Sequence, residues 1–359
     1  IFKKGGFDVI IGNPPYVEYS KVERDYTLRG YQTESCGNLY AFMIERSLSL
    51  LFNRGHLGMI VPLSSVSTPR MAPIVNLYKI NEARTWLSFY AGDSNPGMLF
   101  NGVKSQLSIH LLKRDVFNIF TTNYIRWFDD GRNTLFDNIL YCQSTEALSK
   151  NEIMKVGFEI ELKIIKKMKS QRISIANYFL RHGKEAFYYR NASGSYYRLF
   201  LTKPPFIKSG KRKDTSTTLK CQPVSIDPKI MVSIFSGTLF HWFWVCFSDN
   251  YHITSKEFRE FCFNKNVCND RTLSQLKTLC QDLMNDYQKK SLIRTEKDNR
   301  NNLIREVQIF KPRESKPIID EIDHVLAKHY GFSEEELNFI INYDIKYRMG
   351  TENEADAEE

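Results

Sequence analysis

Asn13, Pro14, Pro15 and Tyr16 form the group in this sequence that is best suited to chemistry. The Asn side-chain oxygen and the adjacent backbone carbonyl are two hydrogen-bond acceptors, and the two prolines restrict the backbone that holds the carbonyl. Together they can accept both N–H bonds of an amine whose lone pair is delocalised into an aromatic ring, and so free that lone pair to attack a methyl donor. This is orientation and preorganised electrostatics rather than acid–base catalysis. The ring of Tyr16 can stack on the base that carries the amine.

The segments around this group predict the elements that must position it. Residues 7–11 are a short apolar run ended by Gly12, which predicts a buried strand running into a rigid turn. Asn38 can cap a helix whose apolar face runs from Tyr40 to Leu51, Gly55 closes that region, and residues 57–61 predict a second strand. A strand, a helix and a strand in this order are typical of a mostly parallel sheet. Without the preceding strand, the same four residues are also compatible with an ordinary loop.

Further elements follow along the chain. Apolar and polar residues alternate over 106–111, which predicts a half-buried strand, and residues 123–127 predict a second strand that pairs with it. An amphipathic connecting helix is expected around 160–168. Asp227-Pro228 predicts the start of one buried helix that includes Phe235, Phe240, Trp242 and Trp244. Capping boxes predict helices that open at Thr254, Thr272 and Ser333, and a helix that opens at Pro317 should end at Gly331.

The motifs together resemble a known family. The string from Phe7 to Tyr16 resembles motif IV of the class I S-adenosylmethionine-dependent amino-methyltransferases. Residues 38–62 resemble the next helix and strand of the adenine-specific DNA methyltransferases, and residues 100–104 resemble their motif VIII. The strings at 328–332 and 340–348 resemble the end of the single-chain, type IIG-like restriction–modification methylases. The resemblance covers residues 1–125 and 315–348 and is loose between them.

The resemblance implies a site-specific enzyme that transfers methyl from S-adenosylmethionine to N6 of a flipped-out adenine in double-stranded DNA. It implies catalytic roles for Asn13, Pro14, Pro15 and Tyr16, with Tyr16 and Phe100 stacking on the two faces of the base. In this family the Gly-rich cofactor motif precedes Asn-Pro-Pro-Tyr, but only twelve residues precede Asn13. We therefore expect the main cofactor-binding motif to be missing, the chain to be an inactive fragment alone, and an N-terminal part of the same enzyme to be a possible partner.

The expected fold class is α/β. It comprises the C-terminal part of a class I, Rossmann-like methyltransferase sheet, then a mixed α+β target-recognition domain and C-terminal helices. The expected boundaries are 1–130 for the catalytic part, 131–172 for a connecting helix, 173–312 for target recognition, 313–348 for the helices and 349–359 for an acidic, disordered tail.

A polar segment from Lys208 to Lys220 is the main candidate for DNA contact. The net charge is +9, and the chain carries 19 Tyr and 25 Phe, which is compatible with phosphate contact and base stacking. We expect a long loop here that can follow phosphates, although a solvated surface loop fits the same composition. The candidate residues are Lys208, Lys211, Arg212, Lys213 and Lys220.

Other classes of function find less support. The seven histidines and seven cysteines show no zinc-ligand spacing, so no metal is expected. Glu161-Leu162-Lys163 resembles part of a nuclease centre, but no suitably placed Asp precedes it. The apolar stretch 232–247 is short for a bilayer span, so we expect a buried helix and no membrane partner. The odd number of cysteines favours reduced thiols in a cytoplasmic protein, and the resemblance to restriction–modification enzymes implies a bacterial one.

Two alternatives stay open. The chain can be a DNA-binding specificity module with a vestigial catalytic half, or an amino-methyltransferase acting on RNA or protein. Enzymes of the second kind usually end soon after the catalytic domain, whereas more than half of this chain lies beyond residue 130. The sequence does not give the DNA target.

Overall fold

The structure is a computed structural model, and it describes residues 5–23, 27–92, 99–100, 105–127, 129–149, 152–192, 199–209, 212–215, 219–297 and 304–348. The chain divides into two compact units. Unit 1 comprises Ile1–Ile165 and Val245–Asn250, and unit 2 comprises Lys166–Trp244 and Tyr251–Glu359. The expected disordered tail, 349–359, lies outside the described residues.

Unit 1 is built on one sheet. Its strands are β1 (Phe7–Gly12), β2 (Leu51–Pro62), β3 (Ala83–Tyr90), β4 (Leu107–Arg114), β5 (Asn118–Ile125) and β6 (Cys142–Gln143). Its helices are α1 (Leu39–Leu50), α2 (Ser64–Ser67), α3 (Ala72–Ile80) and the first turns of α4 (Glu159–Ser170).

The strand order of this sheet is β1-β2-β4-β3-β5-β6. β1 is parallel to β2, β3 is parallel to β5, and β4 is antiparallel to both β2 and β3. Four strands, β1, β2, β3 and β5, therefore point the same way, so their carboxyl ends lie at one edge of a mixed sheet. This is the expected α/β class with a Rossmann-like sheet.

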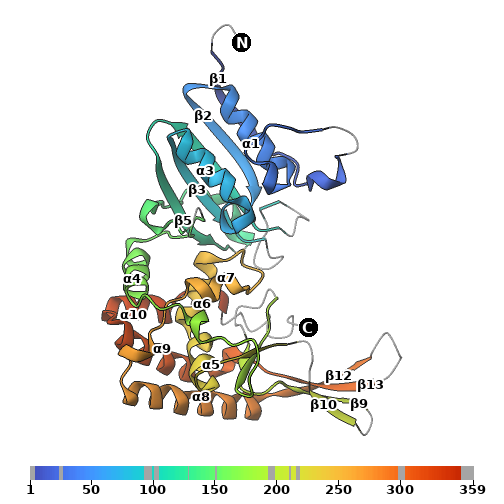
Figure 1. The fold of residues 1–359 in the computed structure, drawn as a ribbon, viewed down its shortest axis with the longest axis vertical. Coiled ribbons are helices and arrows are strands. Elements are labelled where there is room, and N and C mark those ends of the chain that lie inside the picture. Colours follow the sequence, from blue (N-terminus) through green and yellow to red (C-terminus); the bar gives the residue numbers. More distant parts are fainter. Residues whose placement is uncertain are drawn as a thin grey trace. The chain divides into compact units, whose positions relative to one another are not determined.

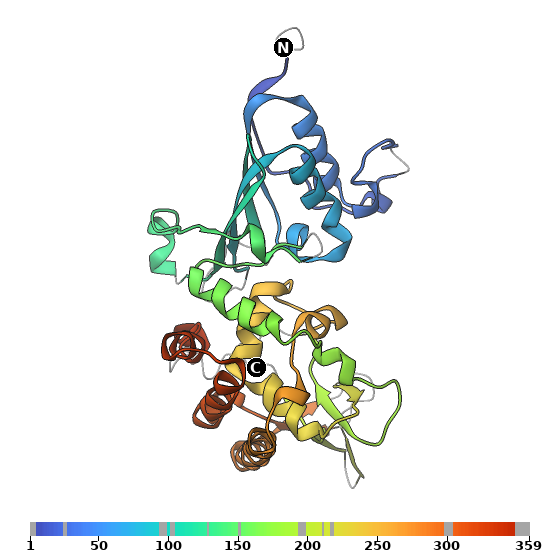
Figure 2. The ribbon, with the colours of Figure 1, turned by 60° about the vertical axis from the view of Figure 1, so that its left-hand side comes forward.

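The two faces of the sheet differ. α1 and α3 lie over one face (Figures 1 and 2) and bury Tyr40, Ile44 and Tyr78 against the strands. The other face carries an apolar row, because register neighbours across β1, β2, β4, β3 and β5 are Ile11, Gly58, Leu111, Trp86 and Phe120. In that row Ile11 is 81% exposed and Leu111 is 45% exposed.

Unit 2 combines helices with two small sheets. Its strands are β7 (Ala186–Tyr189), β8 (Phe200–Leu201), β9 (Phe206–Ser209), β10 (Arg212–Thr215), β11 (Lys220–Pro223), β12 (Leu292–Lys297) and β13 (Ile304–Ile309). Its helices are the end of α4, α5 (Pro228–Ser236), α6 (Thr238–Phe247, whose residues from Val245 on belong to unit 1), α7 (Ser255–Glu260), α8 (Asp270–Lys290), α9 (Lys316–Tyr330), α10 (Glu334–Ile341) and α11 (Ile345–Arg348). The sheet orders are β10-β9-β13-β12 and β11-β7-β8.

An aromatic cluster fills the core of unit 2. The rings of Phe187, Phe235 and Phe258 lie 5.0–6.5 Å apart between centroids, and Phe200 and Phe240 extend the cluster. All five side chains are nearly inaccessible to solvent. These phenylalanines, which the composition made compatible with base stacking, instead stabilise the unit by burial.

The expected single helix after Asp227 is two helices. Asp227 caps α5 as predicted, accepting the N–H of Lys229, but the chain bends by 66° between α5 and α6 at Gly237. A side chain at Gly237 would meet the Asp323 carboxylate at 2.9 Å, which explains the glycine. No single helix among the described residues is long and apolar enough to cross a membrane; only α5 and α6 together reach that length and composition.

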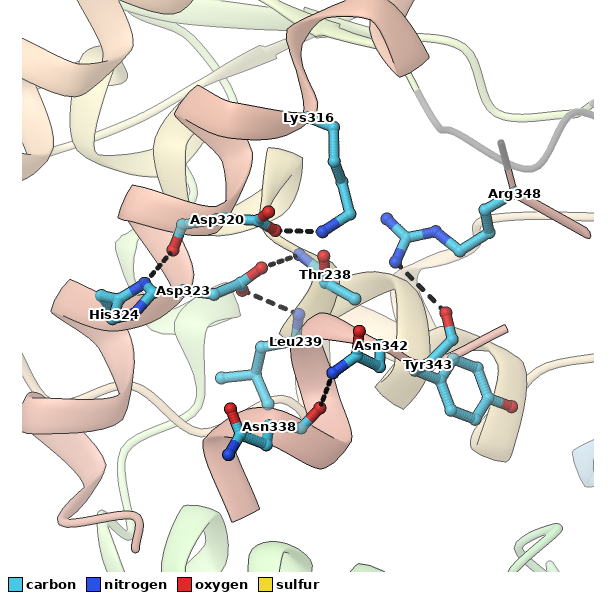
Figure 3. A network of polar contacts seen from close by, with 10 residues as sticks. All are labelled: Thr238, Leu239, Lys316, Asp320, Asp323, His324, Asn338, Asn342, Tyr343 and Arg348. Atoms are coloured by element: carbon cyan, nitrogen blue, oxygen red, sulfur yellow. Dashed lines mark hydrogen bonds and ion pairs between the residues drawn. The ribbon is translucent and has the colours of Figure 1, made fainter. Parts of the chain in front are cut away.

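The C-terminal helices meet the start of α6 in a buried polar network (Figure 3). The carboxylate of Asp323 on α9 accepts the N–H groups of Thr238 and Leu239 at 2.8 and 3.0 Å. Arg348 on α11 is also buried, and its guanidinium donates to the Tyr343 carbonyl at 3.4 Å. The string at 340–348 thus supplies internal contacts of the helical part.

Several local expectations need correction. Residues 118–125 form β5, which was expected to pair with β4 but pairs with β3 and β6. The strand β3 (Ala83–Tyr90), which was not predicted, lies between β4 and β5. α8 begins at Asp270 under the cap of Asn269, so Thr272 lies inside the helix. The capping boxes at Thr254 and Ser333 are confirmed, as is the end of α9 at Gly331 with φ of 68°.

Candidate functional site

Asn13 lies directly after β1, at the edge of the sheet where the parallel strands end. Asn13 is exposed, whereas Pro14 is buried. β1 fixes this position because its residues Ile10, Ile11 and Gly12 pair in parallel register with β2. The side-chain amide therefore directly follows a paired strand and is accessible to solvent.

Tyr16 orients the Asn13 side chain. Its hydroxyl lies 2.9 Å from Oδ1 of Asn13 and 3.0 Å from the carbonyl oxygen of Ile60 on β2, and the one hydroxyl proton serves these two acceptors. The half-buried ring packs edge to face against Tyr40 of α1, with centroids 6.4 Å apart. Burial raises the pKa of Tyr16, so the hydroxyl keeps the proton that it donates.

The turn after Tyr16 is tied to the start of α1. Residues 17–19 pair with 37–39 through two backbone hydrogen bonds of 2.9 Å. The Glu18 carboxylate forms an ion pair of 2.6 Å with Arg70, which lowers the pKa of Glu18, and it also accepts from Asn38. Gly37 lies under the Arg70 guanidinium, where a Cβ would overlap Nη2. Glu18 and Arg70 were not predicted from the sequence, because no local pattern links residues 52 positions apart.

The loop that carries Phe100 begins and ends at this same edge. It follows β3 and precedes β4, and its last residue, Gln106, accepts the N–H of Leu63 directly after β2. Gly92 and Ser105 close the base of the loop, since a Cβ on Gly92 would overlap the Ser105 carbonyl group. Phe100 itself is half-buried. The topology therefore places Asn13 and Phe100 at one edge of the sheet, and their proximity stays a prediction.

A buried histidine network lies within the same sheet. His110 on β4 contacts the Tyr78 hydroxyl through Nδ1 at 2.7 Å and the Ser108 hydroxyl through Nε2 at 2.8 Å. Ser65 of α2 lies 3.3 Å from Nε2. Complete burial lowers the pKa of His110 to about 3, so the imidazole is neutral and serves to fix α2 and α3 on the sheet.

Four of the five residues predicted to contact DNA are described, and they belong to two different sheets. The expected loop is wrong: β9 and β10 form a hairpin that joins β13, and Lys220 begins β11 in the other sheet. Lys208 is exposed and pairs with Glu306 of β13 at 3.1 Å. Arg212 and Lys213 lie on β10, and Lys211 lies outside the described residues.

Glu161 has structural partners. Its carboxylate is buried and accepts the N–H groups of Gly157 and Phe158 at 2.7 and 3.0 Å, at the start of α4. Among the residues that the structure describes, no three His, Cys, Asp or Glu side chains come together in a metal-binding arrangement.

The described residues do not fit S-adenosylmethionine by themselves. The family holds this cofactor on a Gly-rich turn after a parallel strand, but here β1 is followed by Asn13-Pro14-Pro15 and β2 by Leu63. The described glycines with positive φ, at positions 5, 6, 30, 37 and 331, follow none of the parallel strands of the sheet. The groups that bind this cofactor would therefore have to come from outside the described residues.

Residues 1–92 match the Eco57I restriction-modification methylase family. No curated protein matches the chain. Among solved structures, the type IIL restriction–modification enzyme MmeI in complex with DNA is 10% identical over 95% of this chain and 57% of that chain, with a TM-score of 0.48. The type IIG restriction endonuclease BpuSI is 9% identical over 93% of this chain and 54% of that chain, with a TM-score of 0.32.

A third structure, from a type I restriction–modification system, is 14% identical over 47% of this chain and 31% of that chain, with a TM-score of 0.27. The chain thus spans between about a third and somewhat over half of the length of these three structures. The N-terminal quarter is similar to a restriction–modification methylase domain, and this is the class that the comparisons give.

Proposed function

We propose that this chain is part of a bacterial, cytoplasmic restriction–modification enzyme that methylates N6 of adenine in double-stranded DNA. The observation that carries the proposal is the position of Asn13 at the end of β1, with its side-chain oxygen held by the Tyr16 hydroxyl. The match of residues 1–92 to a restriction–modification methylase family supports the same reaction class.

In this proposal Asn13 and the backbone carbonyl of Pro14 accept the two N–H bonds of the target amine. The Tyr16 hydroxyl fixes Oδ1 of Asn13, so that the amine meets an oriented acceptor rather than a rotating amide. The exposed part of the Tyr16 ring and the ring of Phe100 hold the flipped base between them, since an enzyme that modifies a base must take it out of the stack.

The methyl donor would be S-adenosylmethionine, bound mainly by groups that the described residues do not supply. β1 offers a place for such groups, because it is an edge strand whose Val9 and Ile11 are 56% and 81% exposed. Parallel sheets are normally buried on both faces. We propose that the remaining strands and helices of the same methyltransferase domain pair with β1 and cover its apolar row.

Methylation of DNA tests the proposal. The chain is assayed alone and together with a polypeptide that supplies a Gly-rich cofactor-binding half, and N6-methyladenine is quantified in digested DNA. We expect no product from the chain alone, product from the complete assembly, and none after Asn13→Ala in that assembly. Methylated cytosine, RNA or protein in place of adenine would contradict the proposed substrate.

A DNA-binding specificity module with a vestigial catalytic half is the second candidate. The two candidates differ in whether the complete assembly binds S-adenosylmethionine. A calorimetric titration of that assembly decides between them, since a module with a vestigial catalytic half binds DNA but no cofactor.

A further inference from the structure

Unit 2 contains a groove of about 590 Å³ whose walls differ in chemistry. One wall is α8, which contributes Gln281, Asn285 and Gln288. The facing wall comes from the starts of β7 and α5 and from the segment after β8, and it contributes three lysines.

The amides form one row on the exposed face of α8. Their spacing of four and then three residues places them on one side of a helix, and the opposite side buries Leu276, Cys280 and Leu283. Nε2 of Gln281 donates to Oδ1 of Asn285 at 3.2 Å. This bond leaves the carbonyl oxygen of Gln281 and the amide nitrogen of Asn285, one acceptor and one donor, for a ligand.

The row is held in place at its end. Gln308 of β13 donates through Nε2 to Oε1 of Gln288 at 2.8 Å and to the Ser291 hydroxyl at 3.1 Å. Gln308 is buried, so it fixes Gln288 relative to the sheet. Oε1 of Gln288 is thereby engaged, and its amide nitrogen is a second donor on the row.

The facing wall is cationic. Lys184 and Lys203 are exposed and Lys229 is half-buried. Two carboxylates also line the groove, but that of Asp227 caps α5 and pairs with Lys277 at 3.1 Å. Among the described residues that line the groove, Glu185 is the other anionic side chain, so the lysines leave a net positive wall.

On this geometry we propose that the groove binds duplex DNA, with the lysines on phosphates and the amide row of α8 on base edges. Phosphates are held by cations, whereas Asn and Gln read bases because their amides match the donor and acceptor pattern of a base edge. A free anion would use the lysines alone and would leave the amide row without a role. This inference rests on the proposed DNA substrate and adds the residues that determine its specificity.

A selection from a randomised duplex pool tests the amide row. The chain is incubated with the pool, bound duplexes are sequenced, and the preferred site is compared with that of the double variant Gln281→Ala, Asn285→Ala. Alanine is the best helix former, so α8 is retained. We expect preference at one or two adjacent base pairs to fall about 5- to 100-fold, while the other positions are kept. Gln275→Ala, an exposed amide on α8 outside the groove, is the matched control.

The lysine wall is tested by affinity at several salt concentrations. The triple variant Lys184→Ala, Lys203→Ala, Lys229→Ala should bind all duplexes more weakly and lower the slope of log affinity against log salt by about 2 to 3. Lys289→Ala, an exposed lysine of α8 outside the groove, should change little by comparison.

The outcomes separate the inference from the proposed function. An unchanged preferred site in the amide variant, or no preferred site in the parent chain, overturns the inference even where salt-dependent DNA binding persists. Weaker binding in the lysine variant with an unchanged site in the amide variant shows phosphate contact only, which overturns the amide role. No binding to any duplex would instead contradict the proposed DNA substrate.

Discussion

At the scale of single residues, the catalytic proposal depends on how one amide oxygen is held. Asn13 is exposed, and an exposed side chain by itself samples several rotamers. The Tyr16 hydroxyl restricts it, and that hydroxyl is anchored in turn on the Ile60 carbonyl and on the ring contact with Tyr40. In the proposed mechanism the Tyr16 hydroxyl would position Asn13, whereas the Tyr16 ring would stack on the base.

Tyr16→Phe separates these two roles. The ring remains for stacking, but Asn13 loses its donor, which is worth about 1 kcal/mol for an ordinary hydrogen bond. We expect the methylation rate of the complete assembly to fall about five- to tenfold with little change in DNA affinity. Tyr19→Phe is the control, because the Tyr19 hydroxyl accepts from the N–H of Leu28. A rate unchanged by Tyr16→Phe would remove the positioning role.

His110 makes the stability of unit 1 depend on pH. Its pKa is about 3 in the folded protein and about 6.5 when unfolded, so only the unfolded chain binds the proton between these values. The contribution is complete above pH 6.5 and is lost as the pH falls toward 3. At pH 4.5 the free energy of unfolding is lower than at neutral pH by about 2 to 3 kcal/mol on this account.

Hydrogen exchange of peptides from β2 and β4, followed through urea unfolding at about pH 7.5 and about pH 4.5, measures this loss. His110→Gln should be less stable at the higher pH but should lose less on acidification. His56→Gln removes an exposed histidine of β2, and its free energy of unfolding should equal that of the parent chain at both pH values. Equal pH dependence in all three proteins would refute the assignment.

At the scale of elements, the sequence predicted local features well and distant ones poorly. Apolar periodicity and end signals predicted β1, α1, α4, α9 and α10, because those signals lie within a few residues. The expected side-chain cap of α1 is wrong, since Asn38 makes no capping bond and donates to Glu18 instead. β3 was missed because apolar and polar residues do not alternate clearly around Trp86. As a result, β5 was wrongly predicted to pair with β4. The hairpins β9–β10 and β12–β13 join into one sheet through residues about 100 positions apart (Figure 1), which no local pattern encodes.

The start of α6 is the element most dependent on one distant side chain. Asp323 accepts two N–H groups that the helix cannot satisfy itself, in a fully buried position (Figure 3). Asp323→Ala leaves both donors buried without acceptors, so we expect a loss of about 2 to 4 kcal/mol in the free energy of unfolding. Glu321→Ala removes an exposed carboxylate of the same helix and should cost less than about 1 kcal/mol. Urea unfolding measures both, and equal losses would contradict this difference.

At the scale of the whole molecule, the sheet of unit 1 has an open side. The strand order ends at β1, whose free edge and exposed Ile11 continue into the row formed by Leu111, Trp86 and Phe120. An edge strand with exposed apolar side chains favours pairing with another strand or association between copies. The same sheet carries Asn13 but no Gly-rich turn among its described residues, so one covering segment would account for both the apolar surface and the cofactor site.

Ile11→Lys and Leu111→Lys together test this connection. Both side chains are exposed in the described structure and point away from the core under α1 and α3, so the isolated chain should keep its stability to within about 1 kcal/mol. In the complete assembly, the two buried charges should weaken association with the cofactor-binding half by at least about tenfold and lower methylation in parallel. Lys substitution at Val116, which is exposed but outside the row, is the control. Undiminished association would mean that the cofactor-binding half covers another surface, and that the apolar row needs a different partner.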